Sequence, residues 1–312
     1  TIRVTAQLLE AAGGSHVWAE TYERELLAES LFAVQDDITS QIINQVGDIH
    51  GAVNRANMQA LRHQEDIALH DYDCILLAYE YQRFLTPDKH GPVRECLEET
   101  VARNPSYADA WANLAYTYTD QYWTGYEGPE KPLELALAAA RKAVELDQTS
   151  QIAHFSLANV YFFLDEIESF LIEAEKTLAL NPNNTDMIAA IGIRVTYAER
   201  HDRGLALIEK ATKLNPAHPG WYWFPLAYHH YRNTDYETAL SYTRRVDMPG
   251  FWPYHWWLTI IHGQLGDKDR AAVAVAELNA LSPNYKNDPE PFLRMWFKTD
   301  EAVAHLMEGL QK

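Results

Sequence analysis

Cysteine is scarce in this sequence, with only Cys74 and Cys96 among 312 residues. Two cysteines are too few for the disulfide framework that holds a small secreted domain together. Both lie in apolar segments with a helical pattern, where an unpaired thiol packs as a small apolar group. We therefore expect two buried free thiols in a reducing compartment, which favours a cytoplasmic protein.

Long apolar runs and basic surfaces are lacking as well. No run of about 18 apolar residues occurs, so the sequence predicts no membrane span. Lysine and arginine number 26 against 44 aspartates and glutamates, which gives a formal net charge of −18. A nucleic-acid-binding protein needs a basic face, so we expect neither nucleic acid nor membrane as a partner. The acidity suits solubility or attraction to a basic protein.

The sequence also lacks the short motifs that carry catalysis. It has no glycine-rich phosphate loop, no G-x-S-x-G, no H-E-x-x-H and no paired C-x-x-C. His229, His230, His255 and His262 invite a metal site, but their spacing is not that of a compact ligand set. We interpret them as packing or hydrogen-bonded residues, and we expect no catalytic residue, metal or cofactor.

Three asparagine–proline pairs punctuate the chain, at Asn104-Pro105, Asn181-Pro182 and Asn215-Pro216. Each pair follows a stretch with helical periodicity, and proline cannot continue a helix. The last two prolines are 34 residues apart, a period known for repeated helix–turn–helix units. The pairs therefore predict where one unit ends and the next begins.

The segments between these pairs repeat an order of bulky residue, Leu, small residue and Tyr, followed by small and apolar residues and a closing Pro. The matching residues are Trp111, Leu114, Ala115 and Tyr118, then Leu157, Ala158, Tyr161, Leu180 and Pro182, then Ile191, Gly192, Ala211, Leu214 and Pro216. Looser matches are Leu226, Ala227, Ala239 and Leu240, then Leu258, Gly266, Ala271 and Pro283, with a degenerate unit over 70–105. On these residues the chain resembles the tetratricopeptide-repeat (TPR) family.

The resemblance implies an all-α superhelical solenoid of about six helix–turn–helix units, which works by binding a protein or peptide. We assign the array to residues 66–290. Residues 291–312 form a capping segment, because Asp300–Gln311 has the pattern of an amphipathic helix that can close an open array. The unit near 108 departs from the family pattern through an insertion, DQYWTGYEGPEKP, between its two helices.

The first 65 residues have a sequence pattern that differs from that of the repeats. Ile2–Leu9 and His16–Tyr22 have strand patterns around a Gly13-Gly14 turn, which predicts a β-hairpin, and a helix is predicted over Leu31–Val46. The string VTAQLLEAAGGSHVWAETYERE resembles the end of a TolB-like α/β domain that precedes TPR arrays in some bacterial signalling proteins. Their output domains resemble class III adenylate/guanylate cyclases or winged-helix modules. A lone hairpin has unpaired edges, so we expect self-association through it.

Aromatic residues are unusually dense in the carboxyl half, as in WYWF at 221–224 and FWPYHWW at 251–257. In TPR arrays the first helix of each unit lines a concave groove, and its rings supply rigid contact area. The predicted groove residues are Phe155, Asn159, Phe162, Ile193, Trp221, Phe224, Tyr228, Tyr231, Arg232 and Trp256. The competing interpretation is that many of these rings belong to the core between helices.

Three functions are consistent with these features. The leading hypothesis is a non-catalytic regulatory module that binds a peptide or a protein domain in the concave groove. The second is a small-ligand sensor whose groove aromatics close around an apolar or planar molecule. The third is the regulatory region of an adenylate/guanylate cyclase-like enzyme.

Overall fold

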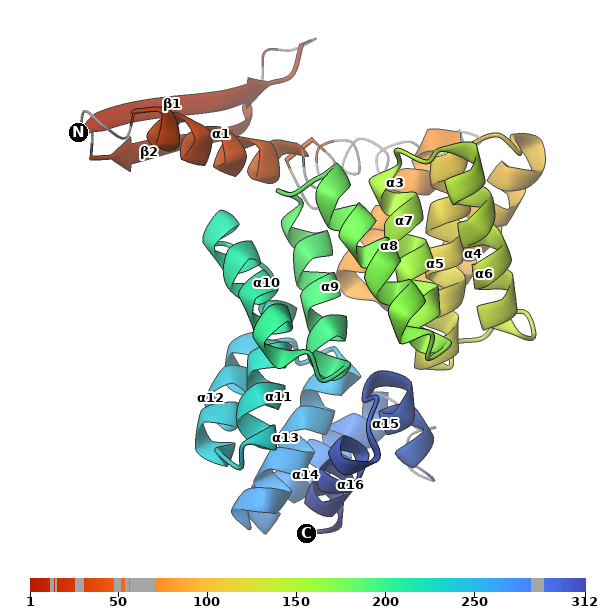
Figure 1. The fold of residues 1–312 in the computed structure, drawn as a ribbon, viewed down its shortest axis with the longest axis vertical. Helices are drawn as coiled ribbons and strands as arrows, with labels where there is room; N and C mark the ends of the chain where they lie inside the picture. The colour runs from red at the N-terminus through yellow and green to blue at the C-terminus, as the bar shows by residue number, and fades with distance from the viewer. Residues whose placement is uncertain are drawn as a thin grey trace.

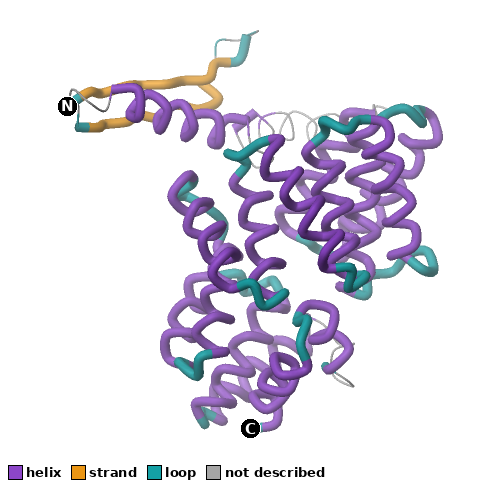
Figure 2. Tube along the Cα trace, viewed as in Figure 1, coloured by secondary structure: helices purple, strands orange, loops and turns teal. Residues whose placement is uncertain are grey.

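The computed structural model describes residues 1–11, 14, 16–25, 31–47, 52–53, 56, 71–281 and 289–312. Strands β1 (Ile2–Leu9) and β2 (His16–Arg24) and helix α1 (Leu31–Gly47) come first, and helical pairs follow (Figure 1). Figure 2 shows strands only at this end of the described chain. The expected helical-repeat fold with an amino-terminal hairpin and helix is confirmed.

Six helical pairs form the described part of the array, in agreement with the predicted number of about six. They are α3 (Asp71–Phe84) with α4 (Pro87–Arg103), α5 (Ala108–Thr124) with α6 (Pro132–Leu146), α7 (Gln151–Phe163) with α8 (Ile167–Leu180), α9 (Thr185–Tyr197) with α10 (His201–Leu214), α11 (Phe224–Arg232) with α12 (Tyr236–Val246), and α13 (Trp252–Leu265) with α14 (Lys268–Leu281). A short 3-10 turn, η1 (Gly220–Trp223), precedes α11, and α15 (Glu290–Trp296) and α16 (Asp300–Gln311) close the chain. In Figure 1, α3–α8 form one block and α9–α16 continue into a second, so the array bends.

Each predicted asparagine–proline pair lies at the end of a helix. Asn104, Asn181 and Asn215 are the C-cap residues of α4, α8 and α10. The prolines that follow have no backbone N–H with which to extend the hydrogen-bond ladder. After Asn181 the next unit begins three residues later with its own cap, where the side chain of Asn184 accepts a hydrogen bond from the Met187 N–H at 3.1 Å.

Small residues occur where helices approach closely. A Cβ added to Gly204 of α10 would lie 2.8 Å from the carbonyl oxygen of Gly192 in α9, which is closer than packed atoms come. Helix α16 packs on α13, where a Cβ on Gly309 would lie 2.8 Å from the carbonyl oxygen of Ile260. The small residue predicted at 192 thus has a steric reason, because a side chain there would separate the backbones. Pro283 of the last predicted unit lies outside the described residues.

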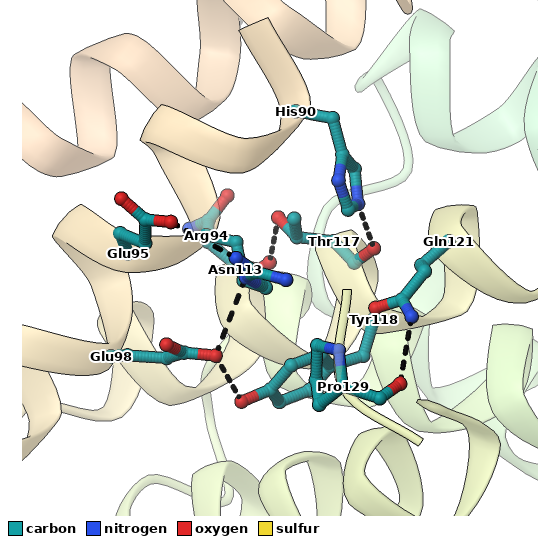
Figure 3. A network of polar contacts seen from close by, with 9 residues as sticks. All are labelled: His90, Arg94, Glu95, Glu98, Asn113, Thr117, Tyr118, Gln121 and Pro129. Carbon is teal, nitrogen blue, oxygen red and sulfur yellow. Dashed lines mark hydrogen bonds and ion pairs between the residues drawn. The ribbon is translucent and has the colours of Figure 1, made fainter. Parts of the chain in front are cut away.

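The insertion between α5 and α6 folds back on its own unit. Figure 3 shows Gln121 donating a hydrogen bond to the carbonyl oxygen of Pro129, at 2.8 Å. Nearby, Tyr118 of α5 donates to Glu98 of α4 at 2.8 Å. The hydroxyl of Tyr126, in the insertion, donates to the backbone oxygen of Leu85 at 2.6 Å. The bonds of Pro129 and Tyr126 connect the insertion to α5 and to the residue that follows α3, whereas the Tyr118 bond joins α5 to α4.

The amino-terminal hairpin is an antiparallel pair in which Val4 lies opposite Tyr22. Tyr22 is buried, and β2 contacts α1, where the Arg24 guanidinium pairs with Asp37 at 2.8 Å. The sheet has two strands among the described residues. Self-association through its edges stays a prediction, as does the assignment of 1–65 to a TolB-like domain. Gly13 and the boundary at 65–66 lie outside the described residues.

The expectation of two free thiols is wrong. Cys74 of α3 and Cys96 of α4 form a disulfide, with Cα atoms 5.6 Å apart. Both cysteines lie on the faces through which these helices pack, so the close helix pairing itself brings the sulfurs together. The number of cysteines does not show their distance in space, which here is set by the turn that joins α3 to α4. The inference of a reducing compartment loses its basis, and a cytoplasmic location stays a prediction.

We predict that the disulfide stabilises the first helical pair. It closes a loop across a sequence separation of 22 residues, so breaking it should lower the free energy of unfolding by about 3 kcal/mol through the entropy of the unfolded chain. Urea unfolding of the Cys74→Ser/Cys96→Ser variant, and of the unmodified chain with and without reductant, measures this. An unchanged midpoint in both comparisons would contradict the prediction.

A second prediction concerns the crossing of α9 and α10. Gly204→Ala should lower the free energy of unfolding by about 1–3 kcal/mol, because the added methyl group overpacks the contact with Thr196 and Gly192 of α9. The matched control is Gly250→Ala, where an added Cβ meets nothing within 4 Å and the change should stay within about 0.5 kcal/mol. Equal effects of the two substitutions in thermal and urea unfolding would refute the close crossing.

Candidate functional site

A cavity of about 170 Å³ lies on the inner side of the array. Its walls come from the first helix of successive pairs, α3, α5, α7, α9, α11 and α13, together with α15 and the residue that follows it. The lining residues include Tyr116, Asp120, Trp123, Phe155, Ala190, Ile193, Arg194, Tyr197, Trp221, Phe224, Phe251, Trp256, Trp257, Phe292, Trp296 and Phe297. Helices far apart in sequence therefore contribute to one predominantly aromatic space.

Five of the ten predicted groove residues line this cavity. They are Phe155, Ile193, Trp221, Phe224 and Trp256. Trp221 remains half-buried, whereas Phe155 and Phe224 retain only 6% exposure. The structure thus brings residues of five different helical segments together, although most of each side chain is engaged by its neighbours.

The other five predicted residues serve contacts within the chain. The amide oxygen of Asn159 accepts a hydrogen bond from Arg194 at 2.7 Å, and Phe162 is fully buried against Phe163 and Phe170. The hydroxyl of Tyr228 donates to Glu199, and Arg232 pairs with the same carboxylate at 2.9 Å. The hydroxyl of Tyr231 donates to the backbone oxygen of His305 at 2.9 Å. A binding role for these five stays a prediction.

The carboxyl-terminal segment crosses the inner face of the array. Trp296 contacts rings of both blocks, with centroid separations of 5.0 Å to Phe163, 5.3 Å to Trp123 and 6.1 Å to Tyr197. The backbone N–H of Lys298 donates to the Tyr197 carbonyl at 3.3 Å, and its ammonium group pairs with Asp165 at 2.5 Å. This segment therefore occupies part of the concave surface on which the sequence predicted a partner.

Arg194 is the buried cation of the cavity, although it is not among the predicted groove residues. Its side chain rises from α9, is only 6% exposed, and has its guanidinium carbon 5.6 Å from the Trp296 ring centroid and 5.9 Å from that of Phe155. Nε donates to Asn159 and Nη1 to the Ala190 carbonyl at 2.9 Å. Among the described residues no carboxylate forms an ion pair with it. Burial lowers the pKa of Arg194, which nevertheless remains charged.

Burying a charge of this kind costs several kcal/mol. Contacts with aromatic faces return only about 0.5–2 kcal/mol each, so the surroundings of Arg194 offset the cost in part. One feature of the sequence could have indicated that Arg194 is a candidate site residue. Arg194 is the single charged side chain within the apolar run MIAAIGIRVTYA at 187–198, and it follows the predicted groove residue Ile193.

Asp120 is one of two buried acids that line the cavity, the other being Asp186, and it is only 1% exposed. Its Oδ1 accepts a hydrogen bond from the Trp123 indole at 2.8 Å, whereas its Oδ2 has no partner of ordinary geometry among the described residues. Burial raises the pKa of Asp120 to about 7, although the Trp123 bond and the nearby Arg194 and Tyr81 act in the opposite direction. Near neutral pH this carboxyl group therefore exists in both protonation states.

The four histidines take structural positions. His255 lies with its Nε2 2.8 Å from the Pro249 carbonyl oxygen, and burial lowers the pKa of His262 and of His229. The imidazole of His230 pairs with Asp235 at 3.1 Å. Within the ranges that the structure covers, no group of three or more His, Cys, Asp or Glu side chains is arranged to hold a metal ion.

Comparison with known proteins agrees with the fold. No protein-family model matches the sequence. The chain is 29% identical over 161 residues to the protein named Putative adenylate cyclase 3 of Rhizobium meliloti (strain 1021), and 25% identical over 158 residues to the Protein CTR9 homolog of Arabidopsis thaliana. Each alignment covers 50% of this chain, but only 26% of the first protein and 14% of the second.

Among solved structures, the human IFIT1 dimer with m7Gppp-AAAA is similar in fold. It shares 15% identity over 76% of this chain and 59% of its own, with a TM-score of 0.58. At this identity the likeness shows the fold and nothing of the ligand. Of the helices that the structure describes, none has the length and apolarity needed to span a bilayer.

A third prediction tests whether Arg194 serves the fold. Replacing a buried ion and its polar partner by apolar residues of similar size is often neutral or stabilising, by about 1–4 kcal/mol. We therefore expect Asn159→Leu/Arg194→Met to leave the free energy of unfolding unchanged or to raise it. Urea unfolding of this double variant measures the change. A loss of more than about 2 kcal/mol would assign Arg194 a structural role instead.

Proposed function

We propose that this chain is a non-catalytic binding module that takes an apolar group of its partner into the concave cavity. The observation that carries the proposal is the cavity itself, which six helical pairs and the carboxyl-terminal segment build mostly from aromatic and aliphatic side chains. Binding sites for small or inserted groups are concave, mostly apolar and supplied with few polar residues. Asp120 and Arg194 would be those polar residues here.

The leading partner is a peptide or protein domain that inserts one apolar side chain. Trp221 and Phe224 lie at the cavity wall, on η1 and at the start of α11, and Trp221 keeps part of its ring accessible. Large rings held rigidly by neighbours lose little conformational entropy when a partner binds. The chain's acidic balance favours a partner with a basic surface around the inserted residue.

The second candidate is a small-ligand sensor, and one observation favours it. Phe292, Trp296 and Phe297 line the cavity from the carboxyl-terminal side, so the chain's own α15 segment already lies on the surface along which a bound peptide would continue. The space that remains has the size of a small molecule.

We further propose that the module works within a larger bacterial signalling protein. The similarity to Putative adenylate cyclase 3 supports this context, because this chain covers only about a quarter of that protein. A regulatory role beside a cyclase-like output domain is consistent with the absence of catalytic motifs in the sequence.

The fourth prediction tests partner insertion. Ala190 lies on the cavity wall, so Ala190→Trp should fill the space and lower the affinity for peptides selected from a displayed random library by about tenfold or more. The matched control is Val273→Trp, because Val273 on α14 is 65% exposed and outside the cavity. Circular dichroism checks that both variants keep their helical content. Peptides that bind both variants as tightly as the parent chain would refute insertion into this cavity.

A further inference from the structure

Two buried groups of opposite charge face the same cavity without pairing with each other. Asp120 projects from α5 and Arg194 from α9, and both line the space. Each shifts the pKa of the other, yet no ion pair joins them in the described structure. Opposite charges this deeply buried gain most when they form a direct pair.

Each of the two groups also has hydrogen-bonding capacity that the described residues do not use. Trp123 occupies Oδ1 of Asp120, and Oδ2 lies near the Tyr81 hydroxyl without a hydrogen bond of ordinary geometry. Asn159 and the Ala190 carbonyl occupy Nε and Nη1 of Arg194, and no hydrogen bond from its Nη2 occurs within the described parts of the chain. A guanidinium group offers five donors and accepts none, so Arg194 suits a carboxylate. The unpaired oxygen of Asp120 suits a cationic donor.

We propose that the cavity binds a free α-amino acid with an apolar side chain, with its carboxylate at Arg194, its ammonium group at Asp120 and its side chain between the rings. The inference rests on the second proposed function, a small-ligand sensor, and names its ligand class. Tyr116, Phe155 and Trp296 form flat walls beside the two charged groups. The volume of about 170 Å³ accommodates a single amino acid.

A ligand with one charge would satisfy only half of the site. A simple carboxylate would pair with Arg194 but lie near the acidic Asp120, and a simple amine would have the reverse problem. Two further charged residues line the cavity, Arg83 and Asp186. The carboxylate of Asp186 already accepts a hydrogen bond from the Tyr222 hydroxyl at 2.6 Å. The zwitterion is therefore the ligand that matches both of the unused groups.

The affinity for this ligand should depend on pH, because the charge of Asp120 does. Tyr81 of α3, Tyr116 of α5, Tyr126 of the insertion and Arg194 of α9 surround its carboxyl group. Burial raises the pKa of each tyrosine, so these hydroxyls keep their protons near neutrality. Asp120, with a pKa raised by burial to about 7, loses its proton as the pH rises through that value. An ammonium ligand prefers the ionised form, so affinity should be about tenfold lower at pH 6 than at pH 8.

The fifth prediction uses the full chain with L-phenylalanine, L-tryptophan and L-leucine as probes in isothermal titration calorimetry. At least one should bind, and two analogues of the best probe should bind about tenfold or more weakly. The analogue amidated at the carboxyl group lacks the partner for Arg194, and the analogue without the amino group lacks the partner for Asp120. Both comparisons use the parent protein, so they do not depend on the folding of any variant.

Variants then assign each charge to its residue. Asp120→Asn should remove the preference for the amino group and the dependence on pH, and Asn159→Leu/Arg194→Met should remove the preference for the carboxylate. Arg270→Met is the matched control, because Arg270 of α14 is exposed, pairs with Asp267 and lies outside the cavity, and it should bind as the parent does. Equal binding of the singly charged or uncharged analogues would overturn the zwitterion while keeping the sensor. Failure of every probe and analogue to bind would overturn both.

Discussion

Each helical pair of this array can bury its apolar face only against its neighbours. For α13, helix α16 supplies part of that neighbouring surface. It packs on α13 so closely that glycines at 263 and 309 leave no room for side chains between the backbones. Leu306 is fully buried, and Tyr231 bonds to the backbone of α16. The stability of the carboxyl half therefore depends on this closing contact.

The closing contact also decides the shape of the concave surface. Because α16 lies on α13, the residues just before it are held on the inner side of the array. Trp296 then reaches rings of α5, α7 and α9, and Lys298 reaches Asp165 at the end of α7. In this way the bend between the two blocks is bridged by the chain itself. The open groove expected from the repeat pattern becomes a bounded cavity.

The polar groups left in that cavity are the part of the structure that packing does not explain. Asp120 and Arg194 are almost fully buried, carry opposite charges and do not pair with each other. Apolar residues of similar size would satisfy the same helix contacts at lower cost in free energy. Such exceptions to the rules of core packing are expected where a protein binds something. Packing does explain the aromatic walls, because many of those rings belong to the core between helices as well as to the cavity.

Sequence by itself determined the repeated helices, their ends and the terminal cap, because these depend on local chemistry. The proline after Asn181 or Asn215 stops a helix wherever it occurs, and the period of apolar residues fixes which face of each helix is buried. The hairpin and its following helix were also predictable from strand alternation and helical spacing. The predicted face of the first helices supplied five residues that line the cavity, since position on a helix largely decides direction.

Only the tertiary structure decided what those residues contact. The sequence gives no distance between α3 and α4, so it did not reveal that Cys74 and Cys96 meet in a disulfide. The sequence could not show that α15 crosses the inner face, because that path depends on the packing of α16 against α13, a contact between segments far apart in the chain. For the same reason the sequence could not show that Phe162 and Tyr231 pack away from the cavity, whereas Phe155 lines it. The juxtaposition of Asp120 and Arg194 arises from the bend of the array, a cumulative property of many helix contacts that no single segment encodes.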